Sequence, residues 1–208
     1  MNYLQPSEYE EFGLEATTAP AWVTAASAIL DAHCRRATLG VMQYTERLRV
    51  APGRNAVRVT YLPLVAKAPA TTAIVSARAR YAPTRRGESA SDDMVWDAAS
   101  AFGLPGSWID LNATDLETCT ETGELTLPVN ALGWAFGEIE VVYTAGLEPI
   151  PDPVKVACAQ VVKNAQAMPA LNVRAGSLDR MRIEYFADAL LDESVRSLVA
   201  PYVAQKVG

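Results

Sequence analysis

The sequence has few cysteines, a single histidine and no long apolar run. Its three cysteines, Cys34, Cys119 and Cys158, are odd in number and widely spaced, so they predict neither a disulfide framework nor a zinc knuckle. No run of about eighteen apolar residues occurs, and the chain starts with an acidic stretch. We therefore expect no membrane span and no signal peptide, and a protein of a reducing compartment.

Sequence motifs of catalysis are also missing. There is no phosphate-binding loop, dinucleotide fingerprint, nucleophile elbow or zinc-protease helix. His33 adjoins Cys34 on an expected helix, where neighbouring side chains point about 100° apart and do not form a nucleophile–base pair. The carboxylates Asp92, Asp93 and Asp97 do not match a calcium loop. We predict a protein that is no enzyme and needs no metal or cofactor, with a small metal-dependent hydrolase using this acidic cluster as the alternative.

The composition is that of an ordinary globular protein. Half of the 208 residues are hydrophobic and 20% are charged, which argues against disorder, collagen-like repeats and coiled coils. A chain of this length can bury a sizeable core without disulfides. The net charge of −6 argues against a general nucleic-acid binder, because such proteins neutralise phosphates with cations.

Charges of opposite sign occupy separate parts of the chain. Residues 47–87 contain nine basic and no acidic side chains, whereas residues 88–148 contain twelve acidic and no basic ones. The blocks could pair across strands within one subunit, at about 0.2–1 kcal/mol per pair. Alternatively they lie on opposite flanks and meet between copies in a head-to-tail interface. The basic candidates for that interface are Arg47, Arg49, Arg54, Arg58, Arg78, Arg80, Arg85 and Arg86, and the acidic ones are Asp92, Asp93, Asp97, Asp110, Asp115, Glu117, Glu121 and Glu124.

Both ends of the chain show helical periodicity, within about 6–40 and 151–200. A short helix is predicted from Pro6 to Gly13, and a longer one from Pro20 towards Gly40. The apolar face expected for the longer helix is Trp22, Ala25, Ala26, Ile29, Leu30 and His33. A helix after Pro151 should bury Val154, Ala157, Cys158, Val161, Val162 and Ala165 and end before Pro169, and Asp192 should cap a last helix. Residues 168–179 are expected to form a loop, and residues 201–208 an extended tail.

The middle of the chain, about 43–146, alternates polar and apolar residues with period two. The strands predicted there are 43–50, 55–62, 74–81, 108–111, 124–127 and 138–143. The predicted fold is α+β: a small helical bundle with a β-rich antiparallel insertion, forming one domain over 1–208 with a C-terminal tail.

The last third of the chain contains a specific pattern. The segment EIEVVYTAGL at 138–147 is followed by PDPVKVACAQVV at 151–162, and later by RIEY at 182–185 and LLDESVRSLVAPY at 190–202. A strand ending in a Y-T-A-G-like motif before a Pro-x-x-[VI]-[KR] helix start resembles the head–tail connector (adaptor) proteins of tailed bacteriophages and gene transfer agents. The resemblance covers residues 137–205 well and 15–46 loosely; residues between these carry none.

The resemblance implies a structural virion protein that is assembled in the bacterial host cytoplasm. Such connectors form a ring of twelve copies below the portal, extend the channel for double-stranded DNA without binding it specifically, and dock the next stopper or tail protein. An acidic excess suits a lumen through which DNA slides. The tail that would reach the portal comprises Pro201, Tyr202, Val203, Ala204, Gln205, Lys206, Val207 and Gly208. The alternative within phage assembly is a neck stopper or tail-completion ring.

Overall fold

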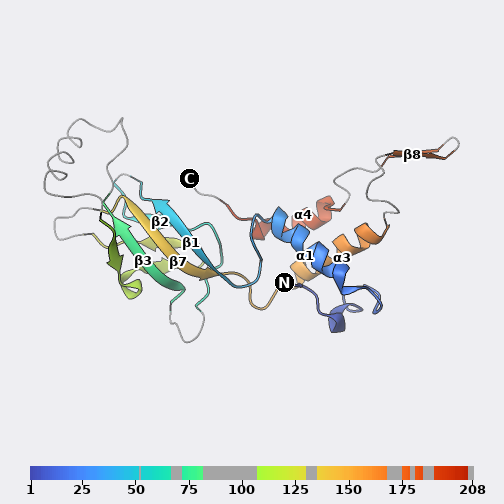
Figure 1. Cartoon of the computed structure of the whole chain (residues 1–208), viewed down its shortest axis with the longest axis horizontal. Helices are drawn as coiled ribbons and strands as arrows, with labels where there is room; N and C mark the ends of the chain where they lie inside the picture. Colours follow the sequence, from blue (N-terminus) through green and yellow to red (C-terminus); the bar gives the residue numbers. More distant parts are fainter. Residues whose placement is uncertain are drawn as a thin grey trace. The chain divides into compact units, whose positions relative to one another are not determined.

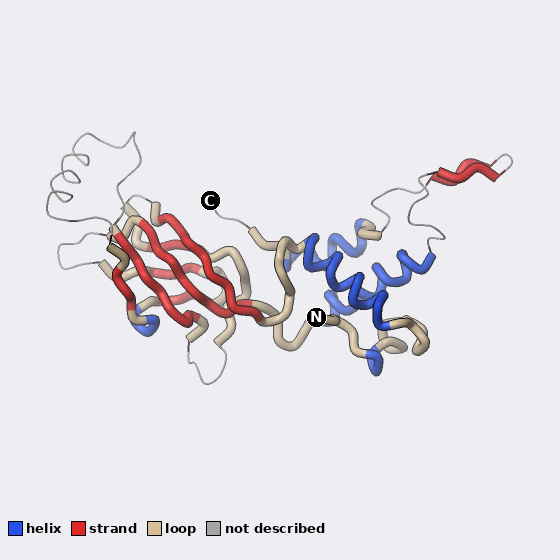
Figure 2. Tube along the Cα trace, in the orientation of Figure 1, coloured by secondary structure: helices blue, strands red, loops and turns tan. Residues whose placement is uncertain are grey.

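The protein folds into two compact units (Figure 1). The computed structural model describes residues 1–51, 53–66, 72–81, 107–129, 135–167, 175–178, 181–184 and 190–205. One unit consists of Met1–Gly40 and Leu147–Ala204, and the other contains Val41–Gly146. The first is mainly helical and the second contains two antiparallel sheets, so the predicted α+β class is confirmed (Figure 2).

The helical unit has three α-helices and two short 3-10 helices in its described part. They are η1 (Pro6–Glu8), α1 (Pro20–His33), α3 (Asp152–Ala167), α4 (Glu193–Val199) and η3 (Ala200–Tyr202). Helix α3 packs against both α1 and α4. No helix in the described ranges is long and apolar enough to cross a membrane. The helix predicted from Pro6 to Gly13 was too long, because only its first turn is 3-10 helical and turns follow.

The buried face of α1 differs from the predicted one. Val23, Ala26 and Leu30 are buried together with the polar Ser27 and Asp31, whereas Trp22 is 38% exposed. The prediction placed only apolar residues and His33 on this face, so it rotated the helix towards Trp22. Ser27 and Asp31 are buried at low cost because the N-terminal segment supplies hydrogen-bond partners for them.

Tyr3 ties the N-terminal segment to α1. Its hydroxyl donates to Asp31, and its backbone N–H donates to Ser27 Oγ at 3.2 Å. The backbone N–H of Leu39 donates to both Asp31 Oδ1, at 3.1 Å, and the Tyr3 hydroxyl, at 2.8 Å. Burial raises the pKa of the Asp31 carboxyl above its ordinary range, while the hydrogen bond from Tyr3 partly offsets that rise. The buried polar positions of α1 are therefore satisfied by residues distant in sequence.

The C-terminal part of the helical unit follows the sequence pattern more closely. Val154, Ala157, Cys158, Val161 and Val162 of α3 are buried as predicted. Asp192 caps α4, because its carboxylate accepts the backbone N–H of Val195 at 2.8 Å. The loop expected over 168–179 is wrong in part, since β8 (Ala175–Leu178) pairs with β9 (Met181–Glu184) there.

The first residues of the expected tail are folded into the helical unit. Ala200–Tyr202 forms η3, Ala204 is 5% exposed, and its backbone N–H donates to the Cys34 carbonyl at 2.9 Å. The prediction of an extended segment from Pro201 is therefore wrong up to Ala204, because this backbone finds partners at the end of α1. Lys206, Val207 and Gly208 lie outside the described residues.

The β unit contains a four-stranded and a three-stranded antiparallel sheet. The larger has the order β1 (Met42–Arg49), β7 (Glu138–Ala145), β3 (Ile74–Arg80), β4 (Ile109–Leu111). The smaller has the order β2 (Ala56–Arg58), β6 (Glu124–Thr126), β5 (Glu117–Cys119), and η2 (Ala113–Asp115) precedes β5. Strand β5 was not predicted, and β2 is shorter than expected.

One hydrophobic core joins the two sheets. Ile139, Val141 and Tyr143 of β7 belong to the same buried cluster as Val57 of β2 and Leu125 of β6. Because side chains alternate along a strand, the neighbours of these residues lie on the outer faces. Each of the two sheets therefore has an outer face of its own, turned away from the shared core.

Candidate interaction surface on the four-stranded sheet

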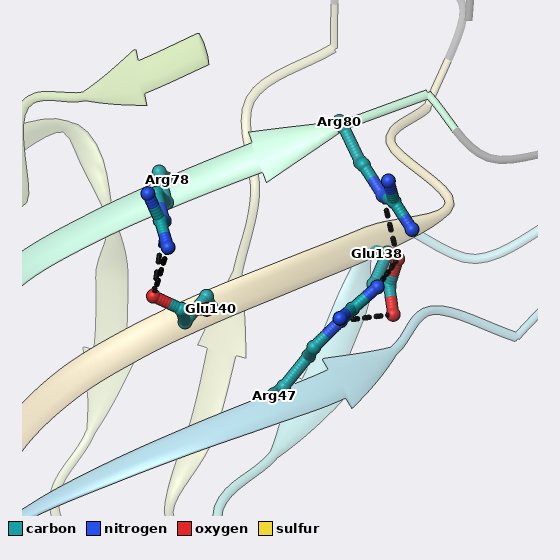
Figure 3. A network of polar contacts seen from close by, with 5 residues as sticks. All are labelled: Arg47, Arg78, Arg80, Glu138 and Glu140. Atoms are coloured by element: carbon teal, nitrogen blue, oxygen red, sulfur yellow. Dashed lines mark hydrogen bonds and ion pairs between the residues drawn. The ribbon is translucent and has the colours of Figure 1, made fainter. Parts of the chain in front are cut away.

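Charged side chains gather on the outer face of the four-stranded sheet. Alternation along β7 places Glu138 and Glu140 on this face while Ile139 is fully buried on the other. The same alternation brings Arg47 from β1 and Arg78 from β3 to the two sides of Glu140 in the register. Two neighbouring strands thus supply arginines to the carboxylates of the central one (Figure 3).

Glu138 is the buried centre of this cluster. Its side chain is 7% exposed. Arg47 donates two hydrogen bonds to its carboxylate, from Nε to Oε1 at 2.6 Å and from Nη2 to Oε2 at 3.0 Å. Arg80 adds a third, from Nε to Oε2 at 2.7 Å. The hydrogen bond from Arg47, with that from Arg80, holds the pKa of Glu138 below its ordinary value, although burial acts in the opposite direction. Glu138 is therefore ionised, and the two arginines compensate the cost of burying its charge.

A second ion pair lies beside it and is more open to solvent. Arg78 Nη2 contacts Glu140 Oε1 at 2.7 Å, and their side chains are 47% and 26% exposed. Exposed pairs of this kind contribute about 0–1 kcal/mol. The Arg78–Glu140 pair consequently adds more to the charge pattern of the surface than to the stability of the fold.

Trp108, immediately before β4, lies among three arginines from strands β1 and β3. The guanidinium carbons of Arg47, Arg78 and Arg80 lie 5.3, 5.2 and 4.9 Å from the centroid of its ring. Such contacts contribute about 0.5–1 kcal/mol each at exposed sites. An aromatic ring ordered among arginines is the composition found at the energetic centres of protein interfaces.

A shallow groove of ≈ 350 Å³ lies next to this cluster. Its lining comes from β3, β4 and β7 and comprises Ser76, Ala77, Arg78, Asp110, Glu140 and Val142. Asp110 is opposite Arg78 in the register and exposed. Four of its six lining residues are polar or charged, which suits contact with charged side chains more than with a purely apolar ligand.

The structure divides the predicted basic residues into two groups. Arg47, Arg78 and Arg80 pair with Glu138 and Glu140, so for these three the pairing within one chain is the alternative that holds. The other described members are exposed and form no ion pair with the described part of the chain; they are Arg49, Arg54 and Arg58. Arg85 and Arg86 lie outside the described residues.

Of the predicted acidic residues, Asp110 lies on the same face as Glu138 and Glu140, opposite Arg78 in the register. The exposed ones are Asp110, Asp115, Glu117, Glu121 and Glu124, whereas Asp92, Asp93 and Asp97 lie outside the described residues. Sequence reasoning did not select Glu138, Glu140 or Trp108 as site residues. Alternation along 138–143 and the equal spacing of arginines in the flanking strands were the signals available for the two glutamates.

The remaining reactive side chains are dispersed. Within the described ranges, no group of three or more His, Cys, Asp or Glu residues is placed to hold a metal ion. Burial raises the pKa of the Cys34 and Cys158 thiols to about 11. Cys119 is exposed, and hydrogen bonding by Thr122 lowers the pKa of its thiol. Comparisons with protein-family models and with curated proteins find no match for the chain.

Proposed function

We propose that the protein is a head–tail connector of a tailed bacteriophage or phage-like particle, forming a ring below the portal. The observation that carries the proposal is the junction between residues 138 and 162. Strand β7 ends at Ala145, Gly146 follows, and α3 begins at Asp152 directly after Pro151. This strand–glycine–proline–helix order coincides with the residues that resemble the connector family.

The backbone conformation at the end of β7 explains the glycine of the Y-T-A-G motif. Gly146 has a φ of 142°, a backbone conformation that other residues rarely adopt. Its N–H donates to the Pro63 carbonyl at 3.0 Å. A side chain at this position would strain the segment that ends β7, which supports the view that the Y-T-A-G pattern is structural and not accidental.

The closing segment supports the proposal in the same way. The helix expected from the LLDESVRSLVAPY segment is α4, capped by Asp192, and the proline and tyrosine of the segment form η3. Because Ala204 is buried, we narrow the residues proposed to dock the portal from Pro201–Gly208 to Gln205–Gly208.

The charge distribution fits a channel protein. Asp115, Glu117, Glu121 and Glu124 are exposed, and these acidic side chains would repel DNA phosphates instead of holding them. In this proposal they face the lumen or a neighbouring copy. Passing DNA would then be a cargo that the ring does not bind specifically.

The test is mass measurement of the full chain with and without purified portal. We expect the chain to join the portal as a ring of about twelve copies, the count being that of the resembling family. A variant lacking Gln205–Gly208 should lose portal binding but keep the circular dichroism and melting of the full chain. A variant cut before Pro201 is not a clean test, because it also removes buried Ala204.

Other results would favour the other functions. A ring that ignores the portal but binds a preassembled portal–connector complex would indicate a neck stopper. A monomer that ignores both and binds divalent metal tightly would favour the hydrolase, and would overturn the proposal. Portal binding that survives removal of Gln205–Gly208 would refute the assignment of the docking segment alone.

A further inference from the structure

The two outer faces of the β unit carry opposite net charge. The outer face of the four-stranded sheet has four arginines and three carboxylates, a net charge of +1; these are Arg47, Arg49, Arg78, Arg80, Asp110, Glu138 and Glu140. The outer face of the three-stranded sheet, with its β5–β6 turn, has three carboxylates and one arginine, a net charge of −2; these are Glu117, Glu121, Glu124 and Arg58. We name them the Trp108 face and the Glu117 face.

The Trp108 face has an ordered centre and unused charge at its edge. Trp108 is fixed by three guanidinium groups, of which those of Arg47 and Arg78 belong to side chains that are about half exposed. Arg49, at the end of the edge strand β1, is exposed and has no ion-pair partner in the described ranges. A rigid aromatic ring bordered by arginines binds a protein surface at little entropic cost.

The Glu117 face is complementary to it. Glu117, Glu121 and Glu124 are exposed and form no ion pair with the described residues. Glu117 and Glu124 belong to the paired strands β5 and β6, and Glu121 to the turn between them, so the hairpin brings the three side chains close together. Carboxylates arranged in this way can accept hydrogen bonds from guanidinium groups of a facing protein.

We propose that the Trp108 face of one copy binds the Glu117 face of the next copy. The two faces belong to two different sheets that share one core, so each copy can bind one neighbour through each face. A contact between two different surfaces is heterologous, and repetition of it yields a ring or a filament. Closure into a ring rests on the proposed function, whereas the contact itself does not.

A second copy explains the features better than a nucleic acid does. Three of the four arginines on the Trp108 face already bind Glu138 or Glu140, and a net charge of +1 gives little attraction to phosphates. The opposite face of the same chain supplies carboxylates in excess. The complement of each face is therefore present at the concentration of the protein itself.

The test exchanges the charges of the two faces in the full chain. Thr45→Glu with Arg49→Glu changes the Trp108 face from +1 to −2, since the carboxylates rise from three to five and the arginines fall from four to three. Glu117→Lys with Glu121→Lys changes the Glu117 face from −2 to +2, since the carboxylates fall from three to one and the cations rise from one to three. These substitutions leave Glu138, Glu140 and their arginines in place.

Sedimentation at low salt measures the association. We expect wild-type self-association to weaken at high salt, and each double variant alone to associate at least about tenfold more weakly. An equimolar mixture of the two variants should regain association, because each then offers the face that the other needs. Should a double variant fail to fold, Arg49→Glu and Glu117→Lys alone make the same comparison.

A mixture that associates no better than its separate variants would overturn the proposal, as would a wild-type chain that remains monomeric at low salt. These results are separate from those of the portal experiment. If the chains associate through the two faces but do not bind the portal, the connector role is refuted and the contact between the faces is not. If the protein binds the portal but the mixed double variants do not regain association, the proposed contact between the two faces is refuted and the connector role is not.

Discussion

At the scale of the residue, Glu138 is the most consequential side chain of the β unit. It is an ionised carboxylate that is 7% exposed and accepts three hydrogen bonds from two arginines. Glu140 shares the same face and receives one arginine. The fold depends more on the partners of Glu138 than on the partner of Glu140, because a buried charge that loses a partner destabilises a fold far more than an exposed one does.

This difference predicts the effect of Glu138→Gln. The free energy of unfolding should fall by about 2 kcal/mol at neutral pH, because charge-assisted hydrogen bonds to two arginines are weakened. Denaturant titration of the folded chain measures it. Glu140→Gln is the matched control and should cost less than about 1 kcal/mol. Equal losses in the two variants would contradict the role given to Glu138.

The same variant has a defined pH dependence. The pKa of Glu138 is lower in the folded chain than its ordinary value of 4.5, so below that value the unfolded chain binds the additional proton first. Stability contributed by Glu138 is complete above pH 4.5 and is lost as the pH falls through the folded pKa. The difference in free energy of unfolding between wild type and Glu138→Gln should therefore shrink on acidification. A difference that stays constant with pH would contradict this prediction.

The sequence predicts the faces of these residues but not their partners. Alternation along 43–50, 74–81 and 138–143 puts the arginines and glutamates on one side of the sheet. The register sets Arg47 opposite Glu140, yet its guanidinium reaches diagonally to Glu138. Arginine is long enough for either choice, so the register alone does not give the partner. The strand order, with β7 between β1 and β3, is what brings these arginines and glutamates together. That order pairs strands distant in sequence, which local periodicity does not encode.

At the scale of the element, the sequence predicts helix starts and caps correctly, because these depend on the local backbone. Prolines mark the starts of α1 and α3, and Asp192 caps α4 as predicted. Strands β5 and β8 were missed because their sequences, ETC and AGSL, show no clear alternation of polar and apolar residues, whereas β4 and β6 of similar length were predicted. The face of α1 was misjudged because Asp31 becomes compatible with burial through hydrogen bonds from Tyr3 and Leu39, which lie outside the helix.

The cap of α4 gives a direct prediction. Asp192→Ala removes the acceptor of the Val195 N–H and should lower the free energy of unfolding by about 1 kcal/mol. Thermal unfolding monitored by circular dichroism measures the loss. Ser194→Ala is the control: its hydroxyl only donates to Asp192, at 2.5 Å, so a smaller change is expected. A larger loss for Ser194→Ala would show that the cap is not the dominant contact.

At the scale of the whole molecule, the chain builds two separate cores. The helical cluster includes Leu30 and Cys158, the β cluster includes Leu125 and Ile139, and no buried residue in the described part of the chain belongs to both. The helical core is assembled from the two ends of the sequence, with the β unit between them. Each core excludes water by its own contacts, so local stability need not be shared between them.

Hydrogen exchange on matched variants tests this independence. Leu30 of α1 and Leu125 of β6 are both fully buried, so truncation of either to alanine should cost about 2–5 kcal/mol locally. We expect Leu30→Ala to accelerate exchange in α1 and α3 while β1, β3 and β7 keep their wild-type protection. Leu125→Ala should do the reverse. Equal acceleration in both units by either variant would mean that the two cores unfold as one, because only a shared cooperative transition carries a local loss into the other core.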